Sequence, residues 1–479
     1  MLPAVAPRPE LARPSPATVD RVRLDLDRAL GASKLVTSPE GCLAHAGDES
    51  EQEPVAPDVV VLAASAEDVV RTFAVAARHG VPVTPRAGGS GKSGGCVPVC
   101  GGIVLSCLGM KAVKEIDRAE GLAVVEPGIV LAELYDAVEA EGLFYPPDPN
   151  SYKQCALGGN IAENASGPRA LKYGVTRDYV LGLEVVTPDG TRLRCGHRTA
   201  KGVSGYDLTA LLVGSEGTLA VTVEATLRLV RKPPAVRTLL ALFDDVQRCV
   251  AAVAHVIASG PPPRCLEMMD AACLAAMRSQ GVPVDEHAGA MLLCEVDGEP
   301  EPCERDMEAL GGRLTDAGAS EVLAAQDEAH RARLWAARQE LTNVLRRLAR
   351  HKVAEDVVVP RGAMGRLVEE VARLSERTGV RMLSYGHAGS GNLHVTLLWD
   401  EDEQLAQVKL ALSEIFRLVV GMGGALTGEH GIGLSKAPYL ALEQSAELIG
   451  IERRIKHLFD PQGILNPGKI FPAGGHGAC

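Results

Sequence analysis

The chain has 479 residues, which suggests two or three domains, and 46% of them are hydrophobic, 23% charged and 3% aromatic. A formal net charge of −12 argues against a nucleic-acid-binding protein, which would carry a basic footprint. The 12 cysteines are scattered without the spacing of a zinc or iron–sulfur site, and no apolar run reaches the ~20 residues of a membrane span. We therefore expect free thiols and a protein of the cytoplasm or the membrane periphery.

The N-terminal part of the chain predicts a loose tail followed by helix and strand patterns. Residues 1–17 contain several prolines and lack the apolar core of a signal peptide. The elements that follow are a helix at Thr18–Leu30, a strand from Pro57 to Leu62, a helix at Glu67–His79, a strand at Val81–Thr84 and, beyond a glycine-rich loop, a strand at Ile103–Leu105.

The glycine-rich loop is Pro85–Pro98, P-R-A-G-G-S-G-K-S-G-G-C-V-P. Its glycines allow positive φ and let backbone N–H groups approach an anion, so the loop predicts a cradle for a pyrophosphate. Gly89–Gly94 fits G-x-G-x-x-G, but no helix opens inside the motif, as the dinucleotide fingerprint requires. A nucleotide-triphosphate P-loop is also excluded, because Arg86 stands where its first glycine belongs.

The order helix, strand, P-R-x-G-G-S-G, strand resembles the FAD-binding (PCMH-type) domain of the vanillyl-alcohol-oxidase family. More narrowly it resembles the branch of D-lactate dehydrogenases, glycolate oxidase large subunits and D-2-hydroxyglutarate dehydrogenases. The resemblance implies an α+β fold, with a two-subdomain FAD-binding domain and an α+β cap that contains an antiparallel sheet. It implies a tail and helix at 1–50, the FAD domain at 51–233, the cap at 234–424 and a segment at 425–479 that returns to the FAD domain.

Later motifs extend this resemblance. The proline-stiffened segment Phe144–Asn150 precedes the small residues of Gly158–Gly167, and both match segments that contact the flavin and its phosphates in the family. Tyr173–Asp178 matches a segment beside the isoalloxazine ring, and Gly214–Val221 one on the adenine or ribose side, although Ala220 replaces the usual glycine. Relatives with covalent FAD carry a histidine in the first loop, and residues 85–98 contain none, so the resemblance implies non-covalent FAD. The residues predicted to bind FAD are Arg86, Ala87, Gly88, Gly89, Ser90, Gly91, Pro146, Asp148, Pro149, Gly158, Gly159, Asn160, Asn164, Gly167, Tyr173, Gly174, Thr176, Glu216, Gly217, Val221 and Asn466.

The remaining elements mix strands and helices without a regular βαβ rhythm, which favours an α+β cap. An Asp189-Gly190 turn predicts a hairpin between Leu183–Thr187 and Thr191–Cys195. In the second half we predict strands at Thr238–Phe243, Leu266–Met269, Ala290–Val296 and Ala319–Leu323, and helices at Asp245–Ser259, Glu301–Leu310 and Gln326–Arg347.

Two further stretches carry the chemistry. Tyr385–His394 holds two histidines around a glycine turn, and Gly428–Gly431 adds a carboxylate and a third imidazole. Two histidines and one carboxylate are a common set for a catalytic divalent metal with open positions. Both stretches match the signature pair of the family, G-H-x-G-x-G-N-L-H and G-E-H-G-I-G. By this resemblance His387, His394 and Glu429 bind a divalent metal, namely zinc; His430 is the base, and Asn392 hydrogen-bonds the substrate.

A substrate carboxylate also needs a cation. Arg338 matches the W-x-x-R arginine of the family, and a guanidinium binds a carboxylate in bidentate fashion. Arg86 and Lys436 are weaker candidates, and Lys352 stands near the second cation of relatives with dicarboxylate substrates. The resemblance thus implies oxidation of a D-2-hydroxy acid, such as D-lactate, by hydride transfer to flavin N5. It leaves open the acid, a homodimer, and the acceptor: quinone, cytochrome, electron-transfer flavoprotein or O₂.

Several alternatives stay open. The nearest is the catalytic subunit of a multi-subunit glycolate oxidase, whose iron–sulfur partners would be separate chains. An aryl- or alkyl-ether flavoenzyme of the same superfamily would not need the His/His/Glu set. A non-catalytic FAD-binding assembly subunit would be expected to have lost it. A metal-dependent hydrolase would use that set but leave the glycine-rich first half unexplained.

Overall fold

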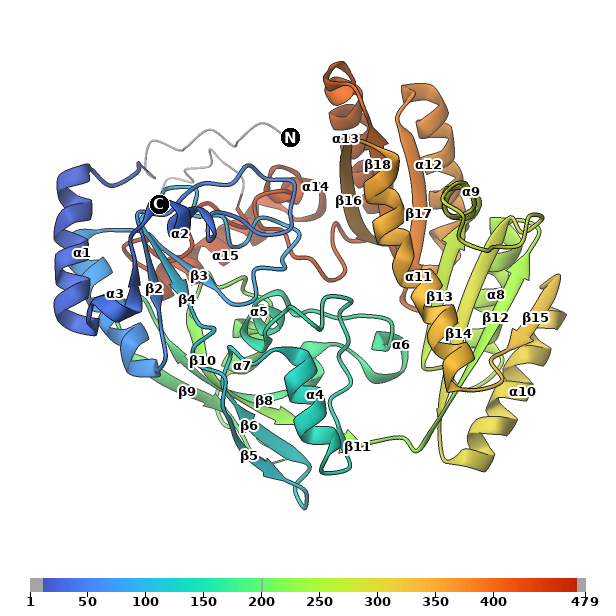
Figure 1. Cartoon of the computed structure of the whole chain (residues 1–479), viewed down its shortest axis with the longest axis horizontal. Coiled ribbons are helices and arrows are strands. Elements are labelled where there is room, and N and C mark those ends of the chain that lie inside the picture. The colour runs from blue at the N-terminus through green and yellow to red at the C-terminus, as the bar shows by residue number, and fades with distance from the viewer. Residues whose placement is uncertain (1–11, 200, 472–479) are drawn as a thin grey trace. The chain divides into compact units, whose positions relative to one another are not determined.

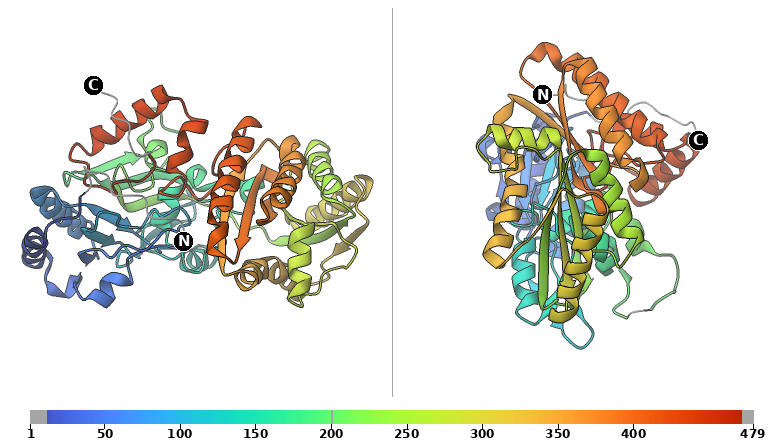
Figure 2. Two further views of the ribbon diagram at one scale, coloured as in Figure 1. Left: turned by 90° about the horizontal axis from the view of Figure 1, so that it is seen from above. Right: turned by 90° about the vertical axis from the view of Figure 1, so that its right-hand side faces the viewer.

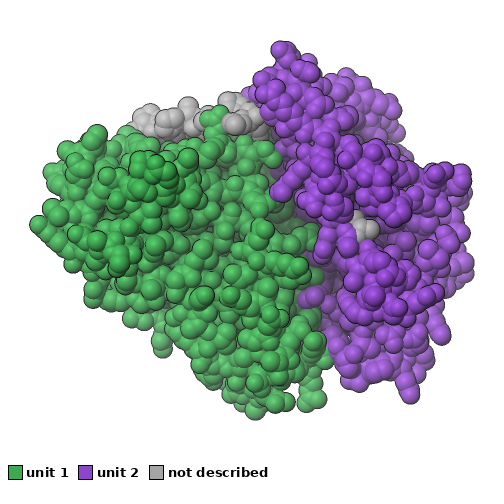
Figure 3. Space-filling model, viewed as in Figure 1, with its two compact units in different colours: residues 1–166, 175–232, 429–479 green, residues 167–174, 233–428 purple. Residues whose placement is uncertain are grey.

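The structure is a computed structural model that describes residues 12–199 and 201–471, so most of the predicted N-terminal tail, residues 1–11, lies outside it. The described chain divides into two compact units, which Figure 3 colours separately. Unit 1 comprises the described residues among 1–166, 175–232 and 429–479. Unit 2 comprises residues 167–174 and 233–428. The chain therefore leaves unit 1 twice and returns to it for its C-terminal segment.

Unit 1 contains a small sheet with the strand order β1-β2-β4-β3. These strands are β1 (Leu35–Val36), β2 (Val59–Leu62), β4 (Ile103–Ser106) and β3 (Val83–Arg86), and both β2 and β3 run parallel to β4. Helices α1 (Pro16–Leu30) and α3 (Ala66–His79) pack on each other, and α3 also contacts β4 (Figure 1). Ser65 caps α3 by accepting the Asp68 N–H, and Gly80 ends it in the left-handed conformation, so local chemistry sets both helix ends.

A second sheet in unit 1 is antiparallel, in the order β5-β6-β10-β8-β9. Its strands are β5 (Val113–Asp117), β6 (Leu122–Val125), β10 (Val221–Arg228), β8 (Val180–Val186) and β9 (Arg192–Gly196). The predicted Asp-Gly hairpin is the β8–β9 pair, whose turn residue Gly190 has φ +83°. The other elements of the unit are α2 (Pro39–Leu43), α4 (Leu131–Glu139), β7 (Leu143–Phe144), α5 (Leu157–Glu163), α7 (Leu208–Leu212), β11 (Val230–Arg231), α14 (Leu440–Glu443) and α15 (Ala446–Phe459).

The C-terminal segment completes the first sheet of unit 1. Val83 donates its N–H to the Ile464 carbonyl at 2.7 Å, and the Asn466 N–H returns to the Val83 carbonyl at 2.7 Å. Leu465 thereby forms a parallel bridge with Val83, the first residue of β3. This bridge holds the C-terminal segment against β3, two residues before the glycine-rich loop begins at Pro85.

Unit 2 is built on an antiparallel sheet with the order β15-β12-β14-β13-β17-β18-β16. The strands are β12 (Ala235–Phe243), β13 (Cys265–Asp270), β14 (Ala290–Gly298), β15 (Glu321–Ala324), β16 (His351–Val358), β17 (Arg381–His387) and β18 (Asn392–Trp399). The helices are α6 (Ala170–Tyr173), α8 (Val246–Ala258), α9 (Ala271–Ser279), α10 (Pro300–Asp316), α11 (Glu328–Leu348), α12 (Met364–Thr378) and α13 (Leu405–Gly421). The sequence predicted no element at α9, β16 or α12.

Helices cover both faces of this sheet (Figures 1 and 2). On one face α11 and α9 pack together over the sheet, and a core cluster that includes Leu341, Met277 and Met269 fills the space between them. Helices α8, α10, α12 and α13 pack against one another and against the strands on the other face. The predicted α+β architecture, with an antiparallel sheet in the cap, is confirmed.

Candidate active site

The two predicted histidine ligands lie on the β17–β18 hairpin of unit 2. His387 is the last residue of β17 and pairs with Asn392 of β18. Tyr385, two residues before His387 on the same strand, pairs with His394. Since side chains alternate along a strand, both histidines lie on the same face of the sheet. Gly391, at φ +78°, lets the chain reverse between them. The two imidazole centroids are 5.5 Å apart, and both side chains are buried.

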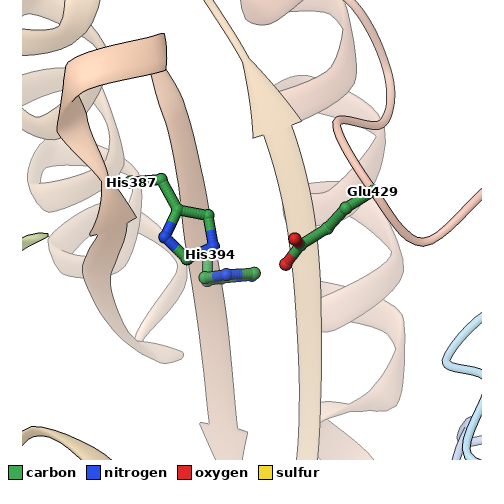
Figure 4. Close-up of side chains that lie close together, drawn as sticks. All are labelled: His387, His394 and Glu429. Carbon is green, nitrogen blue, oxygen red and sulfur yellow. The ribbon is translucent and has the colours of Figure 1, made fainter. Parts of the chain in front are cut away.

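Glu429 completes the predicted metal-binding set. One ligand atom from each of His387, His394 and Glu429 lies within 4.8 Å of the others, and Figure 4 shows the carboxylate pointing toward the imidazoles. Glu429 directly follows Gly428, the last residue of unit 2. The Gly428 N–H donates to the buried Asp356 carboxylate at 2.5 Å, so the chain is anchored immediately before Glu429.

The environment of His387 fits a divalent metal. Its Nδ1 is 2.5 Å from Oε1 of Glu267, a carboxylate on β13 that faces His387 directly in the β13–β17 register. Metal-binding histidines commonly use their second ring nitrogen in this way, which orients the ring and fixes its tautomer. With Nδ1 engaged, Nε2 is the nitrogen that can act as a ligand. Two imidazoles and one carboxylate suit Zn²⁺ with an open position for a substrate oxygen.

Arg338 is joined to the same carboxylate. Its side chain extends from α11, Nη2 donates to Oε2 of Glu267 at 3.0 Å, and the guanidinium lies 4.9 Å from the Tyr385 ring centroid. Arg338 is only 3% exposed, and its Nε has no hydrogen-bond partner among the described residues. A buried, unsatisfied guanidinium N–H is costly, and a substrate carboxylate would satisfy it.

Glu267 is a functional candidate that the sequence analysis missed. It is 1% exposed in the middle of the strand C-L-E-M-M-D. Burial alone would raise the pKa of Glu267, but His387 and Arg338 outweigh that effect and hold it below its usual value. The available signal was the carboxylate itself, because an acidic residue within an apolar core strand requires a partner.

Asn392 and His430 are the remaining predicted catalytic residues. Asn392 is buried and donates from Nδ2 to the Val357 carbonyl at 3.1 Å, which fixes the plane of its amide. Nε2 of His430 lies 3.7 Å from Oε1 of Glu429, and its side chain is 20% exposed. Of the weaker cation candidates, Lys436 is buried, while Lys352 lies on β16 at the position that pairs with Leu398.

The predicted flavin loops converge within unit 1. A Cβ on Gly88 would lie 2.5 Å from the Gln154 carbonyl, one on Gly158 would lie 2.8 Å from Pro127 Cβ, and one on Gly217 would lie 2.8 Å from Pro85 Cγ. Three glycine-rich segments that are distant in sequence therefore pack so closely that side chains at these positions would collide. In the described part of the chain, the N–H groups of residues 87–91 donate to no protein acceptor. Such a row of available donors fits the phosphates of FAD.

Two predicted FAD-binding residues have their side chains committed to protein backbone. The Glu216 carboxylate accepts the N–H groups of Ile432 and Gly433, each at 2.7 Å, and burial raises its pKa although these donors oppose the shift. The Asn466 amide donates to the Glu216 carbonyl at 2.9 Å and the Gly95 carbonyl at 3.2 Å. Both residues have positive φ, 53° and 43°. They tie the first glycine-rich loop to the loop that carries His430.

The other predicted cofactor residues divide between the units. Gly167, Tyr173 and Gly174 belong to the short segment assigned to unit 2, where the Tyr173 hydroxyl donates to Asp297 at 2.8 Å. Within unit 1, the buried Thr176 hydroxyl donates to the Ala165 carbonyl, and Asn164 ends α5 with φ +52°. Arg86 donates to the Gly47 carbonyl, and its guanidinium lies where a Cβ on Gly89 would be. Gly159 and Asn160 lie on α5, Val221 begins β10, and Pro146, Asp148 and Pro149 follow β7.

Comparisons with known proteins show which family the chain belongs to. Residues 57–196 match the family described as FAD binding domain, and residues 232–470 match FAD linked oxidases, C-terminal domain. Glycolate oxidase subunit GlcD of Bacillus subtilis is 40% identical over 94% of this chain and 96% of its own length. D-lactate dehydrogenase of Archaeoglobus fulgidus is 37% identical over 86% of this chain and 91% of its own length. D-2-hydroxyglutarate dehydrogenase of Xanthomonas citri is 33% identical over 94% of this chain and 96% of its own length.

Solved structures support the fold. p-Cresol methylhydroxylase with bound substrate aligns with a TM-score of 0.79 at 15% identity, and 4-ethylphenol oxidase of Gulosibacter chungangensis with 0.78 at 20%. Both alignments cover 96% of this chain and 98% of the other. Among the helices of the described residues, none has the length and apolar character needed to cross a bilayer. The chain therefore belongs to the FAD-linked oxidases of the vanillyl-alcohol-oxidase type, in the branch of these glycolate, D-lactate and D-2-hydroxyglutarate relatives, and it is an FAD-dependent hydroxy acid oxidoreductase.

Proposed function

We propose that this enzyme oxidises a D-2-hydroxy acid of the D-lactate type to the 2-oxo acid, using non-covalent FAD, a divalent metal such as Zn²⁺ and His430 as the base. One observation carries the proposal: the Glu267 carboxylate joins Arg338, a cation for the substrate carboxylate, to His387, a member of the metal-binding set. The two functional groups of a 2-hydroxy acid are adjacent, and they need adjacent receptors of these two kinds.

Each side chain then has a defined task. Arg338 binds and orients the carboxylate with its planar fork, and Asn392 hydrogen-bonds the substrate. His430 takes the hydroxyl proton, since an imidazole can accept a proton near neutral pH. When bound, FAD supplies the hydride acceptor at N5, and the metal supplies a Lewis acid that lowers the pKa of the 2-hydroxyl.

We further propose that residues 51–233, with the return at 425–479, hold FAD, and that residues 234–424 form the cap that binds the acid. Support comes from the match to FAD linked oxidases, C-terminal domain, which begins at residue 232, within two residues of the proposed boundary. The electron acceptor would be a quinone, a cytochrome, an electron-transfer flavoprotein or O₂.

A second candidate function is the catalytic subunit of a multi-subunit glycolate oxidase. The nearly full-length similarity to a protein named glycolate oxidase subunit favours it. In this case glycolate would be the preferred acid, and electrons would leave through a separate chain. Reduction of the flavin by glycolate without steady turnover, until the partner chain is added, would support this candidate over the first.

The test is anaerobic bleaching of the visible absorption band of the oxidised flavin. D-lactate, L-lactate, glycolate and D-2-hydroxyglutarate are added in turn, with and without a chelator. We expect one D-acid to bleach the band, chelation to prevent this, and Zn²⁺ or Mn²⁺ to restore it. A yellow protein that none of these acids reduces would contradict the proposed substrate class. Bleaching that persists after complete metal removal would contradict the role of the metal.

A further inference from the structure

We propose that Glu267 is a positioning residue that orients the substrate cation Arg338 and the metal ligand His387 at the same time. This inference rests on the proposed function and deepens it. The observation is that the two oxygens of one buried carboxylate have different partners. Oε1 lies 2.5 Å from Nδ1 of His387, and Oε2 accepts from Nη2 of Arg338 at 3.0 Å.

The geometry arises from the sheet and one helix. Glu267 on β13 pairs directly with His387 on β17, so the two side chains lie next to each other on one sheet face. Helix α11 contributes Arg338 from above that face, and the Tyr385 ring supports the guanidinium at 4.9 Å from its centroid. Glu267 is therefore in contact with groups from two elements, α11 and β17, which also meet where Arg338 lies against Tyr385. Its position fixes the separation between the receptor for the carboxylate and the receptor for the hydroxyl.

The chemistry of the pair requires a carboxylate. Nη2 of Arg338 is a donor, and Nδ1 of His387 must also carry a proton if Nε2 is to bind a metal. Two donors need two acceptors on the residue between them, and only a carboxylate has an acceptor on each arm. A glutamine offers one acceptor and one donor, so one of the two partners would lose its hydrogen bond. An alanine would release both.

The same sheet face provides a matched control. Glu295 on β14 is 2% exposed and is also bound by α11, through Arg331 Nε at 2.7 Å and Trp335 Nε1 at 2.6 Å. None of the hydrogen bonds of Glu295 in the described structure goes to His387, His394 or Arg338. Glu295→Gln therefore perturbs a buried carboxylate under the same helix without touching the proposed site. Any general loss of stability should appear in both variants.

The experiment uses the full chain with FAD bound. Wild type, Glu267→Gln, Glu267→Ala and Glu295→Gln are purified, and flavin content and thermal unfolding are measured first. Zinc binding to metal-depleted protein is followed by calorimetry. KM and kcat for the acid that bleaches the wild type are then measured at saturating Zn²⁺, so that changes in metal occupancy do not enter KM.

We expect Glu267→Ala to weaken zinc binding by about 10–100-fold and to raise KM at saturating zinc about tenfold or more, the loss expected for one charge-assisted hydrogen bond of Arg338. Glu267→Gln should show at least one of these effects, because its single acceptor can serve one partner. Glu295→Gln should show neither. A yellow, folded Glu267→Ala variant with wild-type zinc affinity and wild-type KM would overturn the inference. The inference would also be overturned if Glu295→Gln changed zinc affinity and KM as much as Glu267→Ala does.

Failure of the proposed function would look different. If the wild type neither binds zinc nor is reduced by any 2-hydroxy acid, the proposed function and this inference both fall. If the wild type does both and the Glu267 variants behave like the wild type, only the inference falls.

Discussion

The flavin cradle and the polar face of the cap sheet are built by opposite means. The proposed FAD cradle of unit 1 is made of backbone. A Cβ at Gly88 would lie 2.5 Å from a carbonyl oxygen, and within the described residues the N–H groups of residues 87–91 donate to no protein acceptor. The proposed substrate-binding face of unit 2 is made of side chains that contact one another, with Glu267 between Arg338 and His387. A backbone site excludes side chains, whereas a side-chain site depends on its supporting partners. The two should therefore fail in different ways.

The largest expected effect is loss of the cofactor from the cradle. Gly88→Val should give a colourless protein, because the new side chain would displace the backbone at Gln154 and Cys155. Zinc binding by His387, His394 and Glu429 should survive, which calorimetry can test. Gly450→Ala is the matched control, since its Cβ would meet only Arg454 Nη1 at 4.0 Å, and this variant should stay yellow. A yellow Gly88→Val protein would contradict a backbone-built cradle.

Removing the proposed base should have the next largest effect, and here turnover should be lost while the cofactor stays bound. His430→Ala should lower kcat by about 10²–10⁴-fold, the usual contribution of a general base, and should leave FAD bound. Stopped-flow reduction of the flavin measures this directly. A variant with nearly normal kcat would show that another group takes the proton.

The substrate cation offers a finer test of the side-chain site. Arg338→Lys keeps the charge but removes the planar fork and the contact with Tyr385. We expect kcat/KM to fall by about 10–100-fold, since one hydrogen bond to a charged group is worth about 1.5–3 kcal/mol. The fall should be smaller for a substrate analogue in which an amide replaces the carboxylate. An equal loss for both compounds would contradict carboxylate binding by Arg338.

The smallest expected effect is a pH dependence of folding stability that arises at Lys469, which contacts the glycine-rich loop. Lys469 is buried and donates to the Val97 carbonyl at 2.6 Å, and burial lowers its pKa to about 8 from the usual 10.5. Between these values the unfolded chain binds the proton and the folded protein does not, so this lysine makes folding more favourable as pH rises. The stability of wild type relative to Lys469→Met should therefore increase from about pH 8 to 10.5 in thermal unfolding. A constant difference across this range would contradict the lowered pKa.

The same contrast explains what the sequence could predict. The glycine-rich loops can be recognised from their composition. Helix α3 begins after the capping residue Ser65 and ends at Gly80, which are residue types that favour helix ends. Strand β16 escaped prediction because Lys352, Glu355 and Asp356 interrupt its apolar pattern, although Asp356 is needed to anchor Gly428. Glu267 escaped because its partners come from β17 and α11, and no spacing along one chain reveals such a triad. Glu216 was predicted as an FAD-binding residue from its loop alone, and the sequence did not reveal that its carboxylate accepts the backbone N–H groups of Ile432 and Gly433.

The bridge between Val83 and Leu465 has a consequence for how the protein is made. On the ribosome, β3 is synthesised early, but its partner emerges only near the end of translation. The antiparallel sheet of unit 2 can fold before that. Until Leu465 is synthesised, β3 at the edge of the first sheet lacks its bridging partner. Capture of the yellow cofactor would then report that the chain has been finished, and a nascent chain arrested before Ile464 should remain apoprotein.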